Sequence, residues 1–520
     1  MSDPNWWQHA VIYQVYPRSY QDNGHDGLGD LGGVTRRLPH IAALGVDAIW
    51  ISPFFRSPMA DMGYDVSDYC DVDPMFGTLA DFDALIAEAH RLGLKIIIDQ
   101  VLSHCSDQHP WFRESRSSRS NAKADWYVWA DPKPDGTAPN NWLSIFGGPA
   151  WEWDGVRMQY YMHSFLTSQP DLNLHHPEVQ TALLDVIRFW LDRGVDGFRL
   201  DAVNHYFHDA QLRDNPSRPP SDAHDVPETN PYGFQEHLYD KTQPENLDFL
   251  ARLRGVLDAY PGRVALGEVG DGDRSPATVA LYTAGDARLH CCYTFDLFGV
   301  RFDAGLIPEV FAQFGETAFA GKACWSFSNH DVVRHVSRWA QPGDDPVALA
   351  KLAIHLLVAL KGPVCLYQGE ELGLPEADIA FEDLRDPYGI RFWPAFKGRD
   401  GCRTPMIWEA DAPYAGFSVA KPWLPVPAAH LPLAVDRQQD DPHSVLTAYR
   451  AAIALRRSHP ALALGSITFL PQQGELLAFI RETAGERLLC LFNFGRKTAT
   501  WEGEAARLTL PPFGFHIARG

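Results

Sequence analysis

Short apolar runs alternate with helical patterns along most of this chain. Runs of this length, separated by amphipathic helical segments, are typical of β/α units. The predicted strands span residues 11–16, 47–52, 94–100, 196–202, 264–269, 292–296, 323–327 and 363–367. Because eight strands alternate with helices, the pattern predicts an α/β fold, a (β/α)8 TIM barrel with its functional side chains at the carboxyl ends of the strands.

The segments between these strands carry helix start and stop signals. Thr78 and Asp81 form a capping box before an apolar helical face, and Gly93 follows that helix. Pro177 begins the next helix and Gly194 ends it. These signals predict helices that pack on the outside of the barrel.

Long insertions interrupt the alternation. The segment after the third strand is rich in Trp, Pro and Gly, and we expect it to form a separate small domain. A polar, Pro-rich segment near residues 204–245 is expected to form a lid or subdomain, and another insertion covers about 373–440. Alternating runs near the end predict a small antiparallel β domain. The predicted domains are the barrel (1–104 and 175–459), the inserted domain (105–174) and the C-terminal β domain (460–520).

Composition narrows the classes of partner. The 520 residues include 45 Lys and Arg against 66 Asp and Glu, a formal net charge of −21. This argues against nucleic acid and against membrane surfaces as partners. The eight cysteines form no CxxC pair, residues 1–8 resemble no signal peptide, and no apolar run is long enough to span a membrane. We therefore expect a cytoplasmic protein with reduced cysteines.

Three acidic residues follow three separate predicted strands. Arg199 and Asp201 lie two positions apart and share one face of a strand. A neighbouring guanidinium lowers the pKa of a carboxyl group, so we expect Asp201 to be charged and nucleophilic. Glu268 follows an apolar strand, where desolvation favours the protonated form, and Asp331 ends a third run. We expect the three acids to form one site with divided roles.

Five separate motifs of this chain resemble those of glycoside hydrolase family 13, the α-amylase superfamily, and they occur in the same order along the chain. Residues 169–173, with the sequence QPDLN, are similar to the signature of its bacterial α-glucosidase and oligo-1,6-glucosidase subfamily. The resemblance implies a barrel with a B domain inserted after strand 3 and a C-terminal antiparallel β domain. The other four motifs are DQVLSH at 99–104, GFRLD at 197–201, GEV at 267–269 and SNHD at 328–331.

The resemblance implies a role for each polar residue. Asp201 would be the nucleophile and Glu268 the acid and then the base of a retaining mechanism, which needs two carboxyl groups in opposite protonation states. Asp331 and His330 would bind hydroxyl groups of the sugar, and His104 another. A lone residue such as His104 also fits a core position, and only its motif favours a role in the site.

Further residues match the subfamily's pocket. Asp61 and Tyr64 resemble the pair that closes the pocket beyond the bound glucose, where Tyr64 would stack on the sugar and Asp61 would pair with Arg399. We expect Arg399 rather than Arg403 to contact sugar. Two aromatic residues are candidates for pocket walls, although each also fits an ordinary core position: Phe146 and Phe165.

The loop DNGHDGLGD at residues 22–30 resembles a calcium or magnesium loop, because hard cations take oxygen ligands at alternating loop positions. Asp22, Asp26, Asp30 and the Leu28 carbonyl fall in register, but Gly24 stands where the family usually has Asn. A Gly- and Asp-rich turn without metal is the alternative. No organic cofactor is expected.

The sequence therefore predicts an exo-acting α-glucosidase that acts on short oligosaccharides and transfers glucose to sugar or alcohol acceptors. Ala202, after the nucleophile, implies a preference for α-1,4 bonds, since Val goes with α-1,6 bonds in this subfamily. The alternatives are an oligo-1,6-glucosidase, and a same-fold isomerase such as trehalose synthase or sucrose isomerase, although the RLDRD loop of sucrose isomerases is absent. A non-catalytic transporter heavy chain would need an anchor and often lacks the acids. The sequence does not indicate the oligomeric state.

Overall fold

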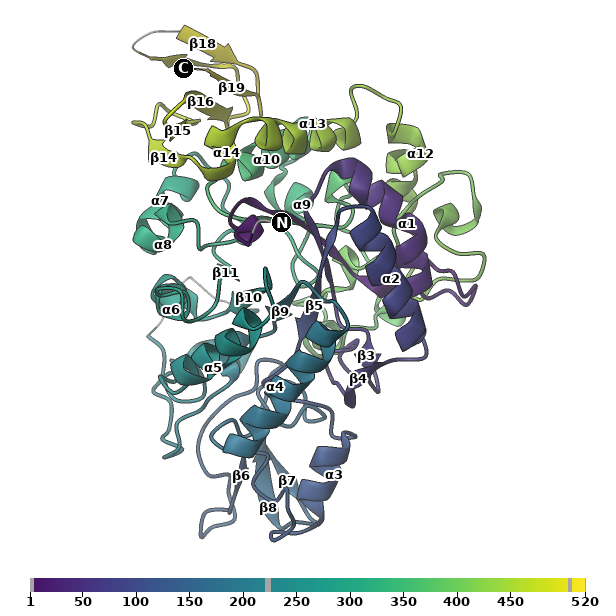
Figure 1. Ribbon diagram of the computed structural model, residues 1–520, viewed down its shortest axis with the longest axis vertical. Helices are drawn as coiled ribbons and strands as arrows, with labels where there is room; N and C mark the ends of the chain where they lie inside the picture. The colour runs from purple at the N-terminus through teal and green to yellow at the C-terminus, as the bar shows by residue number, and fades with distance from the viewer. Residues whose placement is uncertain (1–3, 220–225, 504–506, 520) are drawn as a thin grey trace.

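The computed structural model describes residues 4–219, 226–503 and 507–519 (Figure 1). Parts of three predictions lie outside these residues: the start of the chain, the middle of the 204–245 insertion and a piece of the C-terminal domain. In Figure 1 the C-terminal strands lie at one end of the molecule and the sheet of the first insertion lies at the other, with the barrel between them.

Eight parallel strands form the barrel, in the chain order that the sequence predicts. The sheet order is β11-β10-β9-β5-β2-β1-β13-β12. A parallel bridge between Cys292 of β11 and Ala323, just before β12, and the hydrogen bond from Cys324 N to Cys292 O over 2.8 Å connect the two edges of the sheet, so the barrel is closed. The strands are β1 (Val11–Val15), β2 (Ala48–Ile51), β5 (Lys95–Gln100), β9 (Gly197–Leu200), β10 (Val264–Val269), β11 (Cys291–Thr294), β12 (Trp325–Ser326) and β13 (Val364–Tyr367).

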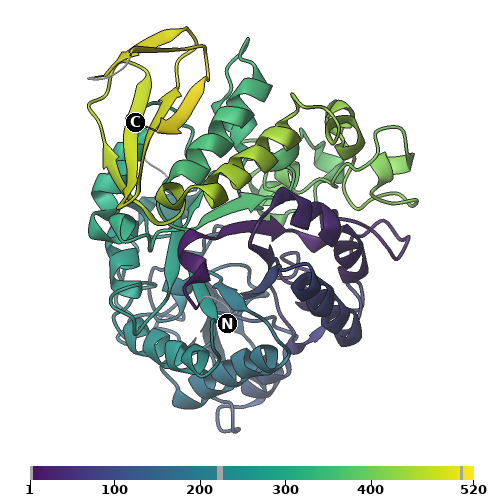
Figure 2. The same cartoon turned by 45° about the horizontal axis from the view of Figure 1, so that its top comes forward.

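Helices surround the strands, as Figure 2 shows. Thr78 and Asp81 cap α2 reciprocally, and Pro177 occupies the first turn of α4, which confirms both predicted helix starts. The helices around the barrel are α1 (Leu31–Leu44), α2 (Leu79–Arg91), α4 (Pro177–Asp192), α5 (Asn246–Asp258), α6 (Ser275–Tyr282), α7 (Leu306–Phe314), α8 (Glu316–Phe319), α9 (His335–Trp339), α10 (Pro346–Ala359) and α13 (Val445–Ser458).

The insertion after β5 has its own sheet and core. Its strands pair in the order β6-β8-β7, and Trp142, Trp151 and Met162 are buried in its core. A hairpin of β3 (Phe55–Arg56) and β4 (Asp68–Val72) lies between β2 and α2 in the chain. The insertion contains α3 (Pro110–Ser117), β6 (Trp129–Ala130), β7 (Trp151–Asp154) and β8 (Gln159–Met162), and the later insertion contains α11 (Pro387–Phe392) and α12 (Val435–Gln438).

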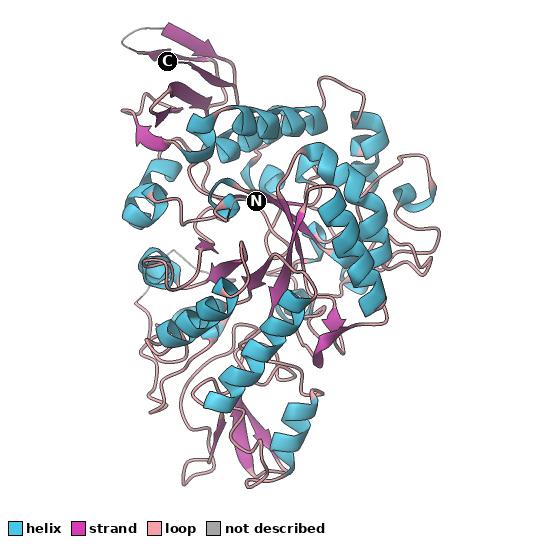
Figure 3. Cartoon of the chain, viewed as in Figure 1, coloured by secondary structure: helices cyan, strands magenta, loops and turns pink. Residues whose placement is uncertain are grey.

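The C-terminal segment forms two antiparallel sheets (Figure 3). Buried Arg481 of β15 donates to the Ala359 carbonyl of α10, and buried Arg456 of α13 donates to Leu360 O over 2.9 Å. The elements are α14 (Pro460–Leu464), the sheet of β14 (Ser466–Phe469), β15 (Leu476–Thr483), β16 (Glu486–Asn493) and β19 (Phe515–Arg519), and the pair β17 (Ala499–Glu502) and β18 (Arg507–Leu510).

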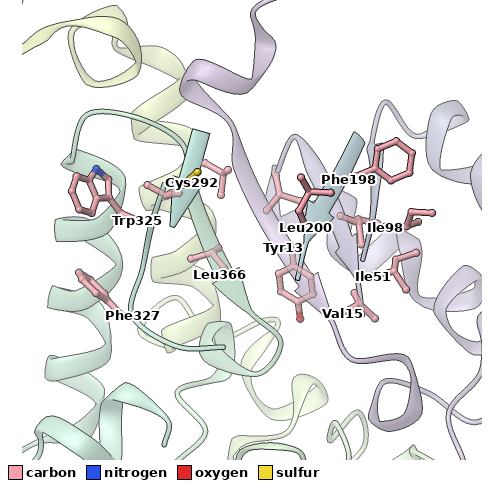
Figure 4. Close-up of a cluster of buried hydrophobic side chains, with 14 of the residues drawn as sticks. Tyr13, Val15, Ile51, Ile98, Phe198, Leu200, Cys292, Trp325, Phe327 and Leu366 are labelled. Atoms are coloured by element: carbon pink, nitrogen blue, oxygen red, sulfur yellow. The ribbon is translucent and has the colours of Figure 1, made fainter. Parts of the chain in front are cut away.

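Alternation along the strands divides their side chains between two faces. Ile98, Phe198 and Leu200 belong to the cluster of buried hydrophobic side chains shown in Figure 4. Asp99 follows Ile98 and Arg199 lies between Phe198 and Leu200, so both have side chains on the opposite face, because successive strand residues alternate. The register pairs these two residues across β5 and β9, which brings a buried guanidinium beside a buried carboxylate.

Candidate active site

Most of the predicted site residues line one pocket, of about 720 Å³, at the carboxyl ends of the barrel strands. Among the predicted catalytic and sugar-binding residues, Arg199 and His330 do not line it, and both side chains are fully buried. Arg199 and His330 therefore lie behind the pocket wall, where they can act through its charged residues. The predicted residues that line the pocket are Asp61, Tyr64, His104, Phe146, Phe165, Asp201, Glu268, Asp331 and Arg399.

One guanidinium binds three carboxylates at the base of this pocket. Arg199 Nη1 lies 2.8 Å from Asp99 Oδ1 and 2.7 Å from Asp201 Oδ1. Its other terminal nitrogen, Nη2, lies 2.5 Å from Glu268 Oε1. The contact with Asp201 follows from their spacing on β9, but the contacts with Asp99 and Glu268 depend on neighbouring strands.

The Glu268 carboxylate has two further donors. Tyr293 donates its hydroxyl to Glu268 Oε1 over 2.6 Å, and Ala202 N donates to Oε2 over 3.0 Å. The Tyr293 hydroxyl oxygen also accepts a hydrogen bond from Arg199 Nη2 over 2.6 Å. The sequence analysis missed Tyr293. Its position on the sixth predicted strand was the available signal, and the structure places it in register with Glu268.

The expected low pKa of Asp201 is wrong. Burial raises the pKa of Asp201, and the charges of Glu268 and Asp99 add to this effect against the opposing charge of Arg199. Burial likewise raises the pKa of Asp99, to about 6. The physical reason is that one guanidinium is shared among three carboxyl groups, so the cluster favours retention of a proton. Two-carboxylate glycoside chemistry requires one such proton.

A second arginine organises the other side of the pocket. Arg399 Nη2 lies 2.8 Å from Asp61 Oδ1 and 2.7 Å from Asp386 Oδ1, which confirms the predicted pairing with Asp61. Burial raises the pKa of Asp61 to about 6 despite this partner. Arg399 lines the pocket, whereas Arg403 is buried outside its lining, as expected for a sugar contact by Arg399.

Asp331 is held ionised between both arginines. Its Oδ1 lies 3.2 Å from Arg399 Nη1 and 2.8 Å from Arg403 Nη2. Burial opposes ionisation, but His330, Arg399 and Arg403 outweigh it and lower the pKa of Asp331. A charged carboxylate at the pocket surface can accept hydrogen bonds from two sugar hydroxyls.

Tyr64 and His330 form a stacked pair behind this carboxylate. Their ring centroids are 5.4 Å apart with an angle of 10°. Gln14 Nε2 faces His330 Nδ1 at 2.8 Å, so Nδ1 accepts and the ring proton is on Nε2, which lies 2.5 Å from the Tyr64 hydroxyl. Tyr64 in turn donates to Asp99 Oδ2 over 3.1 Å. These successive hydrogen bonds fix the position of the Tyr64 ring, which the sequence analysis expects to stack on the sugar.

Residues of the QPDLN motif hold the next part of the wall. Gln169 Nε2 lies 3.1 Å from Asp61 Oδ2 and 3.1 Å from His104 Nε2. Burial lowers the pKa of His104 to about 3, so the ring is neutral and can exchange hydrogen bonds with a hydroxyl group. Asp171 of the same motif accepts from the Ser164 hydroxyl over 2.6 Å, which ties the motif to an earlier segment of the first insertion.

Three insertions meet at the rim of the pocket. Phe146 packs between Phe165, at 5.8 Å between ring centroids, and Tyr388, at 5.0 Å. Asn230 donates to Ile145 O over 2.7 Å and to the Tyr388 hydroxyl over 3.1 Å. The described part of the 204–245 insertion is thus bonded to the other two. Sequence reasoning missed Asn230 and Tyr388, which carry no motif.

The loop at residues 22–30 is held by its own backbone N–H groups. Asp22 Oδ2 accepts from Gly27 N over 2.9 Å, and Asp30 Oδ2 accepts from Gly24 N over 2.8 Å. A side-chain carbon at Gly24 would lie within 4.0 Å of the carboxylates of Asp22, Asp26 and Asp30, so the three acids face one spot. Within the described ranges, no three acidic, His or Cys side chains have the arrangement of a metal site.

None of the helices described here has the length and apolar character needed to span a membrane.

Comparison with known proteins gives consistent matches over the whole chain. The family model for the α-amylase catalytic domain matches residues 14–465. A probable α-glucosidase of Rhizobium meliloti (strain 1021) is 62% identical over 509 residues, which are 97% of this chain and 92% of that protein. An oligo-1,6-glucosidase of Heyndrickxia coagulans is 36% identical over 96% of this chain and 93% of its own length.

Solved structures also match over nearly the whole chain. The crystal structure of the α-glucosyl transfer enzyme XgtA superimposes with a TM-score of 0.96 at 55% identity, over 99% of both chains. The trehalulose synthase MutB of Pseudomonas mesoacidophila MX-45 has a TM-score of 0.87 at 32% identity, again over 99% of both chains.

Proposed function

The chain belongs to the α-amylase family and is a glycoside hydrolase, and we propose that it is a retaining, exo-acting α-glucosidase. It would remove terminal α-linked glucose from short oligosaccharides and transfer it to water or to sugar or alcohol acceptors. The observation that carries this proposal is the Arg199 guanidinium bound to both Asp201 and Glu268 beside the pocket. The predicted barrel fold and the resemblance to the α-glucosidase and oligo-1,6-glucosidase subfamily are confirmed.

The first chemical step forms a glucosyl-enzyme. Glu268 gives its proton to the glycosidic oxygen while an Asp201 carboxylate oxygen bonds to the anomeric carbon, and the bond to the leaving sugar breaks. Arg199 and Tyr293 contact Glu268 Oε1 and can stabilise its charge once the proton has left. Asp331, held ionised by two arginines, can grip hydroxyl groups of the reacting sugar.

The second step reverses the roles. Glu268 takes a proton from water or from an acceptor hydroxyl, whose oxygen bonds to the anomeric carbon and releases Asp201. Both bonds are made on the same carbon by two displacements, so the anomeric configuration is retained. The Asp61–Arg399 pair and the Phe146 wall support an exo mode, because they place charged and aromatic groups beyond the glucose that reacts.

Ala202 supports a preference for α-1,4 bonds, as in maltose and sucrose-type substrates. Its small side chain lines the pocket directly after the nucleophile. The similar proteins bear names of both α-glucosidases and oligo-1,6-glucosidases, and MutB is a trehalulose synthase. An oligo-1,6-glucosidase or a same-fold isomerase such as trehalose synthase is therefore the second candidate.

Product analysis by chromatography tests the proposal. Purified enzyme is incubated separately with maltose, isomaltose, sucrose and trehalose. We expect glucose from maltose, and from sucrose with fructose, together with transfer products at high substrate concentration. Release of glucose mainly from isomaltose would favour the oligo-1,6-glucosidase. Conversion of sucrose or maltose into an isomeric disaccharide without free glucose would favour the isomerase, and no reaction with any of the four would contradict the proposal.

We also propose that the 22–30 loop binds one divalent cation, calcium or magnesium, as a structural site. Support comes from the three carboxylates that face the Gly24 position, where a hard cation would offset their repulsion. Asp22, Asp26, Asp30 and the Leu28 carbonyl would be its ligands, and the ion would take no part in the chemistry.

The eight cysteines form no disulfide, which supports the proposed location in the reducing cytoplasm.

A further inference from the structure

A buried lysine lies on the pocket wall beyond the proposed acid. Lys241, from the insertion after β9, lines the pocket although its residue is only 6% exposed. Its ammonium donates to Gly270 O over 2.8 Å, and Gly270 follows Glu268 by two residues. Neither the motifs nor the mechanism above uses this lysine. Because burying an ammonium group is costly unless it is well paired, its position requires an explanation.

The ammonium retains hydrogen-bonding capacity. A lysine has three N–H donors, and in the described part of the chain the Gly270 carbonyl is the one hydrogen-bond acceptor found for Lys241. Two buried polar atoms on neighbouring residues, His205 Nδ1 and Asp240 Oδ1, lack a partner in the same part of the chain. Lys241 and His205 both line the pocket, and Asp240 directly precedes Lys241 in the chain. An ammonium group with N–H donors to spare, on the pocket wall, is suited to a ligand rich in hydroxyl oxygens that accept hydrogen bonds.

Lys241 is not required to fix the strand end. Asn204 already holds Gly270 on both sides, since Asn204 Oδ1 accepts from Gly270 N over 3.3 Å and its Nδ2 donates to Gly270 O over 3.1 Å. The backbone after Glu268 is thus anchored without the ammonium group. The ammonium also lies 5.6 Å from the centroid of the Tyr232 ring, a contact that uses none of its N–H donors in a hydrogen bond to an oxygen and leaves them available to a ligand.

The position of Lys241 selects the part of the substrate that it can reach. The Asp61–Arg399 pair and Asp331 form one side of the pocket, where the reacting glucose would lie. Glu268 protonates the oxygen between that glucose and the leaving group, so the wall that continues from Glu268 to Gly270 borders the leaving group.

We propose that Lys241, with His205 of the same pocket lining, binds hydroxyl groups of the leaving sugar and of the acceptor that replaces it. Asp201, Glu268 and Asp331 line the same pocket, so the pocket suits a neutral polyhydroxylated ligand rather than an anionic one. This inference rests on the proposed α-glucosidase function and names the recognition element on its leaving-group side.

The test compares two substrates that share the reacting glucose. Maltose has a sugar leaving group, whereas α-glucosyl fluoride has a leaving group without hydroxyls. For Lys241→Met, we expect the ratio of kcat/KM on maltose to kcat/KM on α-glucosyl fluoride to fall about tenfold or more, because a charge-assisted hydrogen bond to the leaving sugar is lost. The matched control is Lys322→Met, which removes an ammonium that donates to the Thr283 and Gly285 carbonyls and belongs to none of the pocket-lining residues. It should leave the ratio unchanged.

Equal losses on the two substrates would overturn the proposal, since Lys241 would then act through the strand that carries Glu268. If Lys241→Met does not fold, His205→Phe decides, because it removes the ring nitrogens and keeps an aromatic ring against Phe165. An unchanged substrate ratio in His205→Phe would equally contradict the proposal. A parent enzyme inactive on both substrates would contradict the α-glucosidase function itself, so the two failures are distinguishable.

Discussion

Arg199 binds Glu268 as closely as it binds Asp201: Nη2 lies 2.5 Å from Glu268 Oε1, and Nη1 lies 2.7 Å from Asp201 Oδ1. One fixed cation therefore serves both the proposed acid and the proposed nucleophile. A change of charge on either carboxyl group is felt by the other through this shared partner, so the apparent pKa values of the pH–rate profile belong to the cluster rather than to one residue.

Loss of the nucleophile should abolish turnover. Asp201→Asn removes the carboxylate that would bond to the anomeric carbon, and we expect maltose hydrolysis to fall by several orders of magnitude. Glu268→Gln should slow both steps but spare formation of the intermediate from α-glucosyl fluoride, whose leaving group needs little proton transfer. Initial rates on both substrates check this. Near-normal hydrolysis of maltose by Asp201→Asn would show that the assignment is wrong.

Replacing the shared Arg199 guanidinium should move the pH–rate profile. In Arg199→Lys a point charge cannot contact Asp99, Asp201 and Glu268 together, so the opposition to the raised pKa of Asp201 weakens. Because Asp201 must be ionised to react, we expect the acidic limb of kcat/KM to shift to higher pH, together with a large loss in kcat. The measurement is kcat/KM between pH 4 and pH 9 for parent and variant. An unmoved acidic limb would mean that Arg199 does not set the charge of the nucleophile.

Stability should depend on pH through Asp171. Burial raises the pKa of Asp171 to about 7 in the folded protein, whereas an unfolded Asp titrates near 4. The folded state therefore binds the proton more tightly, and the stabilisation present at low pH is lost as pH rises towards 7. Asp171→Asn removes this loss, so its advantage in free energy of unfolding over the parent should grow by roughly 1–3 kcal/mol from pH 5 to pH 8.

Thermal unfolding at several pH values checks the Asp171 prediction. The matched control is Asp286→Asn, which removes an exposed carboxylate and should give a pH-independent difference from the parent. A constant difference between Asp171→Asn and the parent across this pH range would contradict the prediction.

Linkage preference should respond to Ala202. We expect the parent to favour maltose over isomaltose by roughly tenfold to a few hundredfold, and Ala202→Val to reduce this ratio, since one contact of methyl size is worth about 1–3 kcal/mol. The structure adds a complication, because Ala202 has φ of 40°, a left-handed conformation that strains a β-branched residue. Because this backbone strain is expected to lower kcat/KM on maltose and on isomaltose alike, the ratio of the two kcat/KM values is the diagnostic quantity. A parent that favours isomaltose, or a Val variant with an unchanged ratio, would show that other residues set the linkage.

Chelation should affect folding before it affects chemistry. If the 22–30 loop holds a divalent cation, exhaustive treatment with chelator should lower the melting temperature more than it lowers the activity of the enzyme that remains folded. Addition of calcium or magnesium should restore the melting temperature. An unchanged melting curve would support the metal-free turn, in which backbone N–H groups and the Ser418 hydroxyl satisfy Asp22 and Asp30.

Much of the barrel could be predicted because its signals are local. The order of the eight strands, the capping box at Thr78 and the start at Pro177 depend on short-range patterns of apolar, capping and Pro residues. The motifs also indicated which side chains line the pocket, because the carboxyl ends of barrel strands point to one face. Tyr293, Tyr388, Asn230 and Lys241 could not be identified this way, because their contacts join segments far apart in the chain.

The electrostatics of the site show the same division. The sequence by itself determined that Arg199 and Asp201 share one face of β9, since that depends only on strand geometry. Only the tertiary structure decided that Asp99 and Glu268 share the same guanidinium, because strand register and barrel closure set those distances. The pKa of Asp201 is raised rather than lowered for this reason: burial and through-space charge are properties of the folded neighbourhood, which spacing along the chain does not contain.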